Sequence, residues 1–524
     1  MKILHNANIH TLESSRPMAS AIAIGRGQIL AVGGDEVLTG SDRGERQDMH
    51  GRTILPGLTD AHLHLKAYAL SLEKIDCETA TVDECLRRVR DKAVNTPAGQ
   101  WILGHGWNQN SWGGWPFAAD LDRVAPNHPT YLTAKSLHAS WANGAALKMA
   151  GIQKGMADPK DGQIQRDAQG TPTGILLETA SELVNRLIPE PDVRALADAL
   201  ERAQEILWTF GLTGVHDFDR RECFVALQQL NSEGRLKLRV IKNIPVDQLE
   251  QASDLGLRTG FGDDWLRIGA VKVFMDGALG PRTAAMFQPY DGEPGNTGIL
   301  NHDAEQLFEL GRRAADAGLG MSVHAIGDRA NHEVLDAYEH LRVYERKKGL
   351  PHLRHRIEHV QLLHPQDASR LAQLDVIASM QPLHATSDMR MADTYWGGRT
   401  SLAYAWRTQL DAGARLAFGS DAPVESPNPF LGIHAAVTRR GADGAPGAEG
   451  WHPEQRLSLQ EALEGFSLGG AYAACAEKRQ GRLAAGYLAD LIALETDPYS
   501  VAPEELRSLR SSATMIGGEW VYQA

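Results

Sequence analysis

Two histidines near residue 60 could be ligands of a metal ion. Residues 53–59 form an apolar run that leads directly into Asp-Ala-His-Leu-His at residues 60–64. Side chains two residues apart on a strand point to the same face, so His62 and His64 would project together from a strand end. Imidazole pairs of this kind bind zinc or iron. The alternative for one isolated pair is two surface histidines, so the rest of the chain has to decide.

Four later segments have the same form, an apolar run that ends in a side chain able to bind a metal. The terminal residues are Lys272, His324, His359 and Asp421. One βα unit of a barrel takes roughly 30 residues, which is about the spacing from His324 to His359. If His64 ends strand 1, the four residues end strands 4, 5, 6 and 8. All strand ends of a TIM barrel meet at one face, where active sites lie.

The remaining strands of such a barrel have candidates at the expected places. Residues 211–217 are expected to form strand 2, residues 236–243 strand 3 and residues 375–380 strand 7. After His324, apolar side chains recur at helical spacing, as a crossover helix requires; they are Val334, Leu335, Tyr338 and Leu341. These segments complete an alternating pattern of strands and helices.

The two ends of the chain share a pattern of short apolar runs separated by glycine turns. Neither end has enough strands for a stable sheet alone, so we expect them to form one small sandwich together. The predicted fold class is therefore α/β. It consists of a TIM (β/α)8 barrel at residues 56–470, a β-sandwich made from residues 1–55 and 471–524, and an insertion after barrel strand 1. The insertion, residues 67–190, is rich in tryptophan and glycine.

Taken together, these motifs resemble the metal-dependent amidohydrolase superfamily. The likeness is to its amidohydrolase-3 branch, which includes YtcJ-like and N-substituted formamide deformylase-like proteins. The segments that carry it are residues 106–110 (GWNQN), 273–280 (VFMDGALG), 324–328 (HAIGD) and 420–424 (SDAPV). The resemblance covers nearly the whole chain and does not specify a substrate. It implies one set of metal ligands: His62, His64, Lys272, His324, His359 and Asp421.

Lys272 is the unusual member of this ligand set. A cationic lysine beside two divalent ions would be repelled, so its pKa would fall. The neutral amine could then add CO₂ and become a carbamate, an anion with two oxygens that can bridge two metals. The alternative is an unmodified lysine paired with a carboxylate such as Asp276, at a site with one metal. We expect one or two zinc ions, although the same ligands suit iron, manganese or cobalt.

Several further residues are predicted to contact the substrate from loops at the active face or from the insertion. They are His216, His384, Trp107, Asn108, Asp276 and Arg282. The alternatives are a structural role for His216, loop-fixing hydrogen bonds for the two residues after strand 4, and core packing for the two in the insertion. Glu358 is expected to face away from the site, because side chains alternate along a strand and His359 faces toward it.

The resemblance implies hydrolysis by a metal-activated water, with Asp421 as the general base. The predicted reaction cleaves an amide-type C–N bond outside ordinary peptides, in a formamide, an N-acyl amine or a carbamate. A deaminase or a lactone or ester hydrolase is the alternative enzyme, and Lys272 disfavours a deaminase. A scaffold without catalysis is less favoured, because all six ligand positions are filled.

Composition limits the partners. The formal net charge of −13 argues against binding to nucleic acid. No run of 18 apolar residues predicts a membrane span, and no apolar segment at the start predicts a signal peptide. The four cysteines are scattered, which fits a reducing compartment, so we expect a cytoplasmic protein. The expected partner is a small-molecule substrate, and a homodimer is expected only from the resemblance.

Overall fold

The computed structural model describes residues 1–34, 36–39, 44–134, 139–160 and 162–524. The chain divides into two compact units, each described by itself below. The first comprises Met1–Tyr68 with Leu196–Ala524, and the second comprises Ala69–Ala195. Among the described residues, no helix has the length and apolar character needed to cross a membrane.

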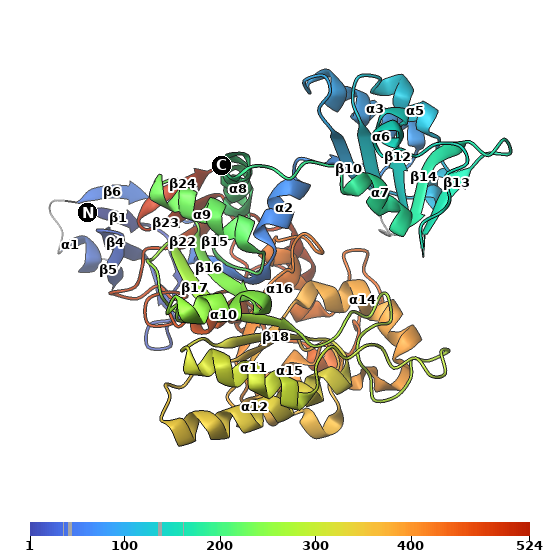
Figure 1. Ribbon diagram of the computed structural model, residues 1–524. Helices are drawn as coiled ribbons and strands as arrows, with labels where there is room; N and C mark the ends of the chain where they lie inside the picture. The colour runs from blue at the N-terminus through green and yellow to red at the C-terminus, as the bar shows by residue number, and fades with distance from the viewer. Residues whose placement is uncertain (35, 40–43, 135–138, 161) are drawn as a thin grey trace. The chain divides into compact units, whose positions relative to one another are not determined.

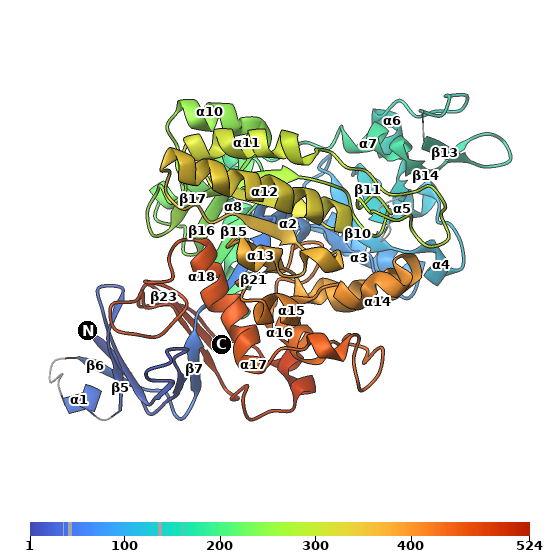
Figure 2. The ribbon, with the colours of Figure 1, turned by 90° about the horizontal axis from the view of Figure 1, so that it is seen from below.

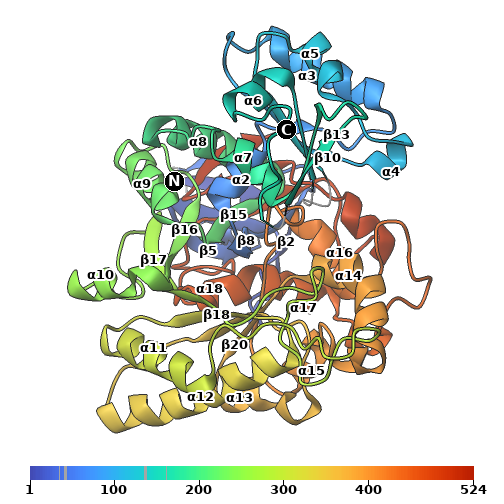
Figure 3. The same ribbon diagram turned by 45° about the vertical axis from the view of Figure 1, so that its right-hand side comes forward.

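Eight parallel strands form the barrel of the first unit, in the order in which they occur along the chain (Figure 3). They are β8 (Leu58–Leu63), β15 (Leu212–Asp217), β16 (Arg239–Pro245), β17 (Leu266–Phe274), β18 (Met321–Ala325), β19 (Arg356–His359), β20 (Ile377–Met380) and β21 (Leu416–Phe418). The first and last strands meet just beyond their carboxyl ends. There Asp421 N–H donates to the carbonyl of His62 (2.7 Å), and His64 N–H donates to the carbonyl of Ala422 (2.8 Å). The predicted TIM-barrel fold is confirmed.

The barrel strands consist mostly of buried residues because both of their faces are covered. Every residue of β18 is buried, for example. The expected strand 3 began at residue 236, but β16 begins at Arg239. The difference has a local cause: the N–H groups of Arg235 and Leu236 donate to Leu230 O, and Lys237 N–H donates to the Gln204 side chain. The backbone N–H groups of these three residues are therefore bonded to Leu230 and Gln204, and pairing with the neighbouring strand begins at Arg239.

Helices connect the strands and cover the outside of the barrel (Figure 2). The crossover helix expected after His324 is α12, which ends at Gly349 in the left-handed conformation (φ 63°), a common helix terminator. A capping box of Asp303 and Gln306 starts α11. The helices of this unit are α2 (Leu65–Ser71, continuing into the second unit), α8 (Val193–Thr209), α9 (Arg221–Ser232), α10 (Leu249–Asp254), α11 (Ala304–Asp316), α12 (Asp328–Lys348), α13 (Arg370–Gln373), α14 (Pro382–Tyr395), α15 (Trp406–Asp411), α16 (Pro429–Thr438), α17 (Leu459–Glu464) and α18 (Gly470–Ala473).

The same unit contains two smaller sheets built from the chain ends (Figure 1). One has the order β5-β4-β1-β6 and the other has the order β24-β23-β22-β7-β2-β3. The two sheets share a core that includes Leu4, Ile24, Ile54, Leu491 and Met515. Their strands are β1 (Lys2–His5), β2 (Asn8–His10), β3 (Met18–Ala19), β4 (Ala21–Gly25), β5 (Gln28–Gly33), β6 (Glu45–Asp48), β7 (Thr53–Pro56), β22 (Leu491–Leu494), β23 (Ala513–Ile516) and β24 (Glu519–Gln523), with α1 (Glu36–Thr39) after β5.

The second unit, which follows β8 in the chain, has a six-stranded sheet of its own in the order β13-β14-β12-β11-β10-β9. Helices α3 and α5 pack with Trp107 and Trp141 in one core, and α6 and α7 pack with Tyr131 and Leu176 in another. The elements are β9 (Ile75–Asp76), β10 (Ile102–Trp107), β11 (Thr130–Ala134), β12 (Ala139–Ala142), β13 (Gly162–Arg166), β14 (Pro172–Glu178), α3 (Val82–Val94), α4 (Gln109–Trp112), α5 (Ala118–Val124), α6 (Gly144–Met149) and α7 (Glu182–Asn185).

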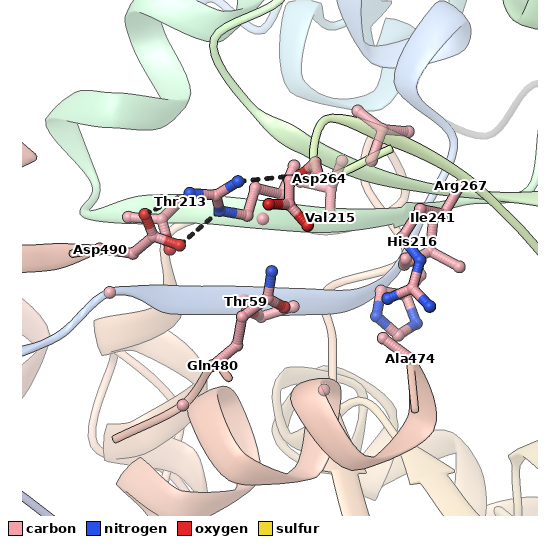
Figure 4. A pocket seen from close by; sticks show the side chains of 16 residues that line it. Thr59, Thr213, Val215, His216, Ile241, Asp264, Arg267, Ala474, Gln480 and Asp490 are labelled. Carbon is pink, nitrogen blue, oxygen red and sulfur yellow. Dashed lines mark hydrogen bonds and ion pairs between the residues drawn. The ribbon is translucent and has the colours of Figure 1, made fainter. Parts of the chain in front are cut away.

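A buried ion pair links the start of β16 to the segment before β22. The Arg239 guanidinium donates to both oxygens of Asp490 at 2.5 and 2.8 Å, and both side chains are almost fully buried (Figure 4). Arg239→Ala leaves Asp490 as an uncompensated buried charge, so we expect destabilisation by about 3–5 kcal/mol. The measurement is the denaturant midpoint of unfolding.

Two controls accompany this prediction. Replacing both partners by apolar residues should recover much of the loss, because no unpaired charge then remains. Arg312→Ala on α11 removes a far more exposed ion pair with Glu309 and should cost less than about 1 kcal/mol. Equal losses in Arg239→Ala and Arg312→Ala would contradict the assigned role of the buried pair.

Candidate metal centre

Three predicted ligands meet where the barrel closes. His62 lies at the end of β8, His64 directly follows it, and Asp421 lies beyond β21 in the left-handed conformation (φ 60°). The Nε2 atoms of His62 and His64 are each 3.5 Å from Asp421 Oδ1. Two metal–ligand bonds of about 2.1 Å at a tetrahedral angle place their ligand atoms about 3.4 Å apart. The three side chains therefore have the spacing that one metal ion requires.

A second group adjoins the first and shares Asp421. The ring centroids of His324 and His359 are 4.5 Å apart, and those of His62 and His359 are 4.9 Å apart. Ligand atoms of His359, His384 and Asp421 lie within 4.8 Å of one another. The structure therefore brings together the side chains that the sequence placed at the ends of strands 1, 5, 6 and 8, with His384 from α14 beside them.

Each of the four histidines has one ring nitrogen bonded to a protein oxygen. The pairs are His62 Nδ1 with Glu358 (2.6 Å), His64 Nδ1 with Asp219 (3.3 Å), His324 Nε2 with the carbonyl of Gly277 (3.0 Å) and His359 Nδ1 with the side-chain oxygen of Gln381 (2.9 Å). An oxygen of this kind only accepts, so the bonded nitrogen carries the proton and the other keeps its lone pair for a metal. The free Nε2 of His62 is buried and has no hydrogen-bond partner in the described part of the chain.

The protonation states of three of these histidines suit metal binding. For His64, burial is outweighed by the hydrogen bond and charge of Asp219, which raise its pKa. Burial, reinforced by the charge of Lys272, lowers the pKa of His62 to about 4 and that of His324 to about 3. Burial also holds the pKa of His359 well below its usual value. These three imidazoles are therefore neutral near pH 7, which is the form that binds metals.

Lys272 is buried on β17, with its amine 4.7 Å from the ring centroids of both Phe218 and Phe274. Burial lowers its pKa to about 8, so a minor neutral fraction exists near pH 7. The suggested pairing of Lys272 with Asp276 is not found. The carboxylate of Asp276 instead accepts hydrogen bonds from the backbone N–H groups of Ala285 (3.0 Å), Ile326 (3.1 Å) and Gly327 (2.8 Å).

Asp60 organises the same edge of the barrel and had no assigned role in the sequence analysis. Its carboxylate accepts the N–H groups of His62 and Ser420, both at 3.0 Å, and the hydroxyl of Ser420 at 2.5 Å. Burial raises the pKa of Asp60 to about 7. Its position two residues before His62 in the Asp-x-His-x-His segment was the available signal.

The expectation for Glu358 is wrong. Its fully buried carboxylate points into the barrel, where it bonds to His62, to the Ser322 hydroxyl and to Arg356. His359 reaches the centre as well because its φ is 76°, outside strand geometry, so simple alternation fails at the strand end. Charged residues within an otherwise buried strand, Arg356 and Glu358, were the overlooked sign of an interior ion pair.

His216 was predicted to contact substrate, but the structure places it inside the barrel. Its Nδ1 is bonded to the Arg356 guanidinium at 2.8 Å. The ring lines a small cavity of about 20 Å³ near the amino ends of β8, β16 and β17, room for about one water (Figure 4). These contacts match the structural alternative for His216.

The two substrate candidates after β17 hold their loop in place. Asp276 accepts the three backbone hydrogen bonds described above. Arg282 pairs with Glu293 (2.6 Å) and donates to the Tyr395 hydroxyl (3.2 Å). These polar groups already have protein partners, which is the loop-fixing alternative.

Trp107 and Asn108 belong to the second unit. Trp107 is fully buried in that unit's core, and its indole N–H donates to Leu132 O at 2.8 Å. A substrate contact through Trp107 would need an exposed ring, so its placement matches core packing. Asn108 lies between β10 and α4, is partly exposed, and stays a prediction.

His384 is the substrate candidate whose surroundings fit best. It lies in the first turn of α14, and its Nδ1 is 3.4 Å from the amide nitrogen of Gln361, a donor. The proton of the ring therefore resides on Nε2, which is 3.9 Å from Asp421 Oδ2. This buried Nε2 has no hydrogen-bond partner among the residues that the structure describes.

A barrel whose strand ends bring histidines and one aspartate together is the architecture of metal-dependent hydrolases. The chain belongs to the amidohydrolase family, because residues 45–522 match the family Amidohydro_3, described as the amidohydrolase family.

Comparisons with individual proteins agree with this assignment. The chain is 34% identical to LONG AFTER FAR-RED 3 of Arabidopsis thaliana over 99% of this chain and 91% of the relative. It is 33% identical to YtcJ of Bacillus subtilis (strain 168), over 99% of both chains. It is 30% identical to an N-substituted formamide deformylase of Arthrobacter pascens, over 99% of this chain and 97% of the relative.

A solved structure of an uncharacterized metal-dependent hydrolase from Pyrococcus furiosus is also similar. It is 31% identical to this chain, with a TM-score of 0.79 over 95% of this chain and 99% of that one. The likeness therefore extends over both units of the chain.

The geometry predicts that the purified protein carries at least one divalent metal ion per chain. His62→Ala should lower the metal content to less than about half, because a ligand to the shared centre is lost. Elemental analysis by mass spectrometry is the measurement. His352→Ala, which removes an exposed histidine paired with Asp375, should leave the content unchanged. Equal metal content in both variants would contradict the assigned site.

Proposed function

We propose that this protein is a metal-dependent hydrolase that cleaves a non-peptide amide-type C–N bond, in a formamide, an N-acyl amine or a carbamate. The observation that carries the proposal is the state of the four histidines. Each has one nitrogen bonded to an oxygen acceptor; the free nitrogens of His62, His64 and His359 lie near Asp421, and the His324 ring lies beside His359. Imidazoles with one lone pair free beside a carboxylate are suited to a divalent metal.

The residues available for metal divide into two groups. His62, His64 and Asp421 would hold one ion, His324 and His359 would hold a second, and a carboxylated Lys272 would supply a further anionic ligand. Zinc is the expected metal, and iron, manganese or cobalt suit the same ligands. When bound, such an ion lowers the pKa of a water molecule and polarises the substrate's carbonyl group.

The chain's own residues supply the proton transfers. The Asp421 carboxylate takes the proton of the attacking water and delivers it to the leaving nitrogen, acting first as base and then as acid. His384 presents Nε2–H to the carbonyl oxygen, where negative charge develops during the attack. The hydrogen bond from Gln361 to Nδ1 keeps His384 in the tautomer that this donation needs.

The walls of the centre favour a substrate with an apolar group. The ring of Phe218 stacks on His62 with centroids 4.0 Å apart, and Phe274, about half exposed, lies 5.2 Å from His324. Ligand sites combine such apolar surface with a few placed polar groups. The relative named N-substituted formamide deformylase supports a small N-substituted amide as the substrate class.

Asp421→Asn tests the catalytic role. An amide cannot take a proton from water, so we expect turnover to fall by roughly 10²–10⁴-fold while most of the metal is retained. Initial rates on a panel of N-formyl and N-acyl amines, with elemental analysis alongside, are the measurement. Turnover near that of the unmodified protein would contradict Asp421 as the base. Activity confined to esters, lactones or amino-heterocycles would replace the proposed substrate class.

Lys272 provides a separate prediction. Protein supplied with metal and bicarbonate should bind two ions bridged by carboxylated Lys272, because the carbamate adds negative charge where two divalent ions meet. Lys272→Ala should then lose about one metal equivalent, and added formate or acetate should restore part of the activity. A metal-replete crystal structure with an unmodified Lys272 amine more than about 4 Å from any ion would contradict the two-metal site.

A further inference from the structure

We propose that Glu358 is a positioning residue for His62. Together with Asp219, it makes the His62–His64–Asp421 half of the centre bind a divalent ion more tightly than the His324–His359 half. This inference rests on the proposed metal centre and is independent of the substrate.

The two halves of the centre differ in the oxygens that bond to their histidines. His62 and His64 donate to carboxylates, those of Glu358 and Asp219. His324 donates to the backbone carbonyl of Gly277 at 3.0 Å, with the carboxylate of Asp276 3.4 Å from the same nitrogen, and His359 donates to the amide oxygen of Gln381. One half is therefore supported by two carboxylates, and the other by two neutral acceptors with a single carboxylate near His324.

Glu358 is held in one orientation as an anion. The Arg356 guanidinium contacts both of its oxygens, at 2.5 and 3.0 Å, and the Ser322 hydroxyl donates to one of them. Arg356 is anchored in turn by donating to Ala61 O (2.7 Å) and Ser379 Oγ (2.6 Å). All of these groups are buried, so the carboxylate cannot turn away from His62.

The carboxylate of Asp219 is also fixed on more than one side. It accepts the N–H groups of Lys66 (2.5 Å) and Ala67 (3.3 Å), just beyond His64 in the chain. The backbone that carries His64 and the ring of His64 are therefore held by one side chain.

The difference in charge has a direct consequence for metal affinity. One ring nitrogen of a metal-binding imidazole faces the metal, and the other carries the N–H. A carboxylate that accepts this N–H fixes the tautomer and makes the ring a stronger metal ligand. The anion also attracts the metal's positive charge, and this attraction is strong in a buried site of low dielectric constant. A carbonyl or an amide fixes the tautomer but contributes no net charge. The first ion should therefore occupy the His62–His64 position.

The first test is equilibrium zinc binding to the full-length protein in competition with a chelator, which needs no substrate. Glu358→Gln should weaken the tighter dissociation constant by roughly 10–100-fold and change the weaker one by less than about threefold. Asp219→Asn should act in the same direction. Glu345→Gln is the matched control. Like Glu358, the Glu345 carboxylate bonds to one arginine, Arg342 (2.8 Å), and to one histidine, His355 (2.8 Å), but neither of these is a candidate metal ligand. This control should leave both constants unchanged.

If Glu358→Gln fails to fold, a second variant and a crystallographic measurement test the same difference in affinity. Gln381→Glu places an anion beside His359 and should tighten the weaker constant. Anomalous scattering from crystals loaded with less than one zinc per chain should show the ion beside His62 and His64. An ion found first beside His324 and His359 overturns the proposal, as does an unchanged tighter constant in both Glu358→Gln and Asp219→Asn. A protein that binds zinc as expected but hydrolyses no amide contradicts the proposed function alone.

Discussion

The carboxylate of Asp60 ties the first strand of the barrel to the last, through the backbone of His62 and both polar groups of Ser420. The two segments next to it that carry candidate metal ligands, one at His62 and one at Asp421, come from opposite ends of the barrel sequence. Their ligand atoms can lie 3.5 Å apart only if the barrel closes in one register. Asp60 fixes that register at the edge of the barrel that carries these residues, and the other candidate ligands lie at the ends of the neighbouring strands.

The inside of the barrel below this edge is unusually polar. Barrel interiors are mostly filled by branched apolar side chains. Here the interior contains Arg356, Glu358, His216, Ser322 and Ser379, all buried. A buried polar network is tolerated when its members satisfy one another, and a partly satisfied one is costly. Glu358 connects this network to His62, so the composition of the interior is explained by the centre above it.

The barrel was predictable from the sequence because its strands are buried on both faces, which leaves continuous apolar runs that end in recognisable ligands. Strand ends were harder to predict, since their geometry depends on local backbone conformation. The Glu358 carboxylate bonds to His62, and the adjacent His359 ring also lies beside the candidate ligands. Neighbouring residues can both do so only because the backbone leaves strand geometry at His359. Partners such as Asp219 for His64 and Gln381 for His359 come from other strand ends and give no local signal. Asp276 and Arg282 fix their loop through hydrogen bonds and an ion pair. The spacing of residues along the sequence does not predict these contacts.

The sheet shared by the two chain ends also constrains how the molecule can be made. Strand β7, which leads directly into the first barrel strand, pairs on one side with β22 from the last tenth of the chain. A ribosome adds roughly 5–20 residues per second, so β7 waits on the order of a minute for this partner. Until then its edge is exposed to other chains, a known route to aggregation. The sandwich can therefore form completely only after the whole barrel has left the ribosome.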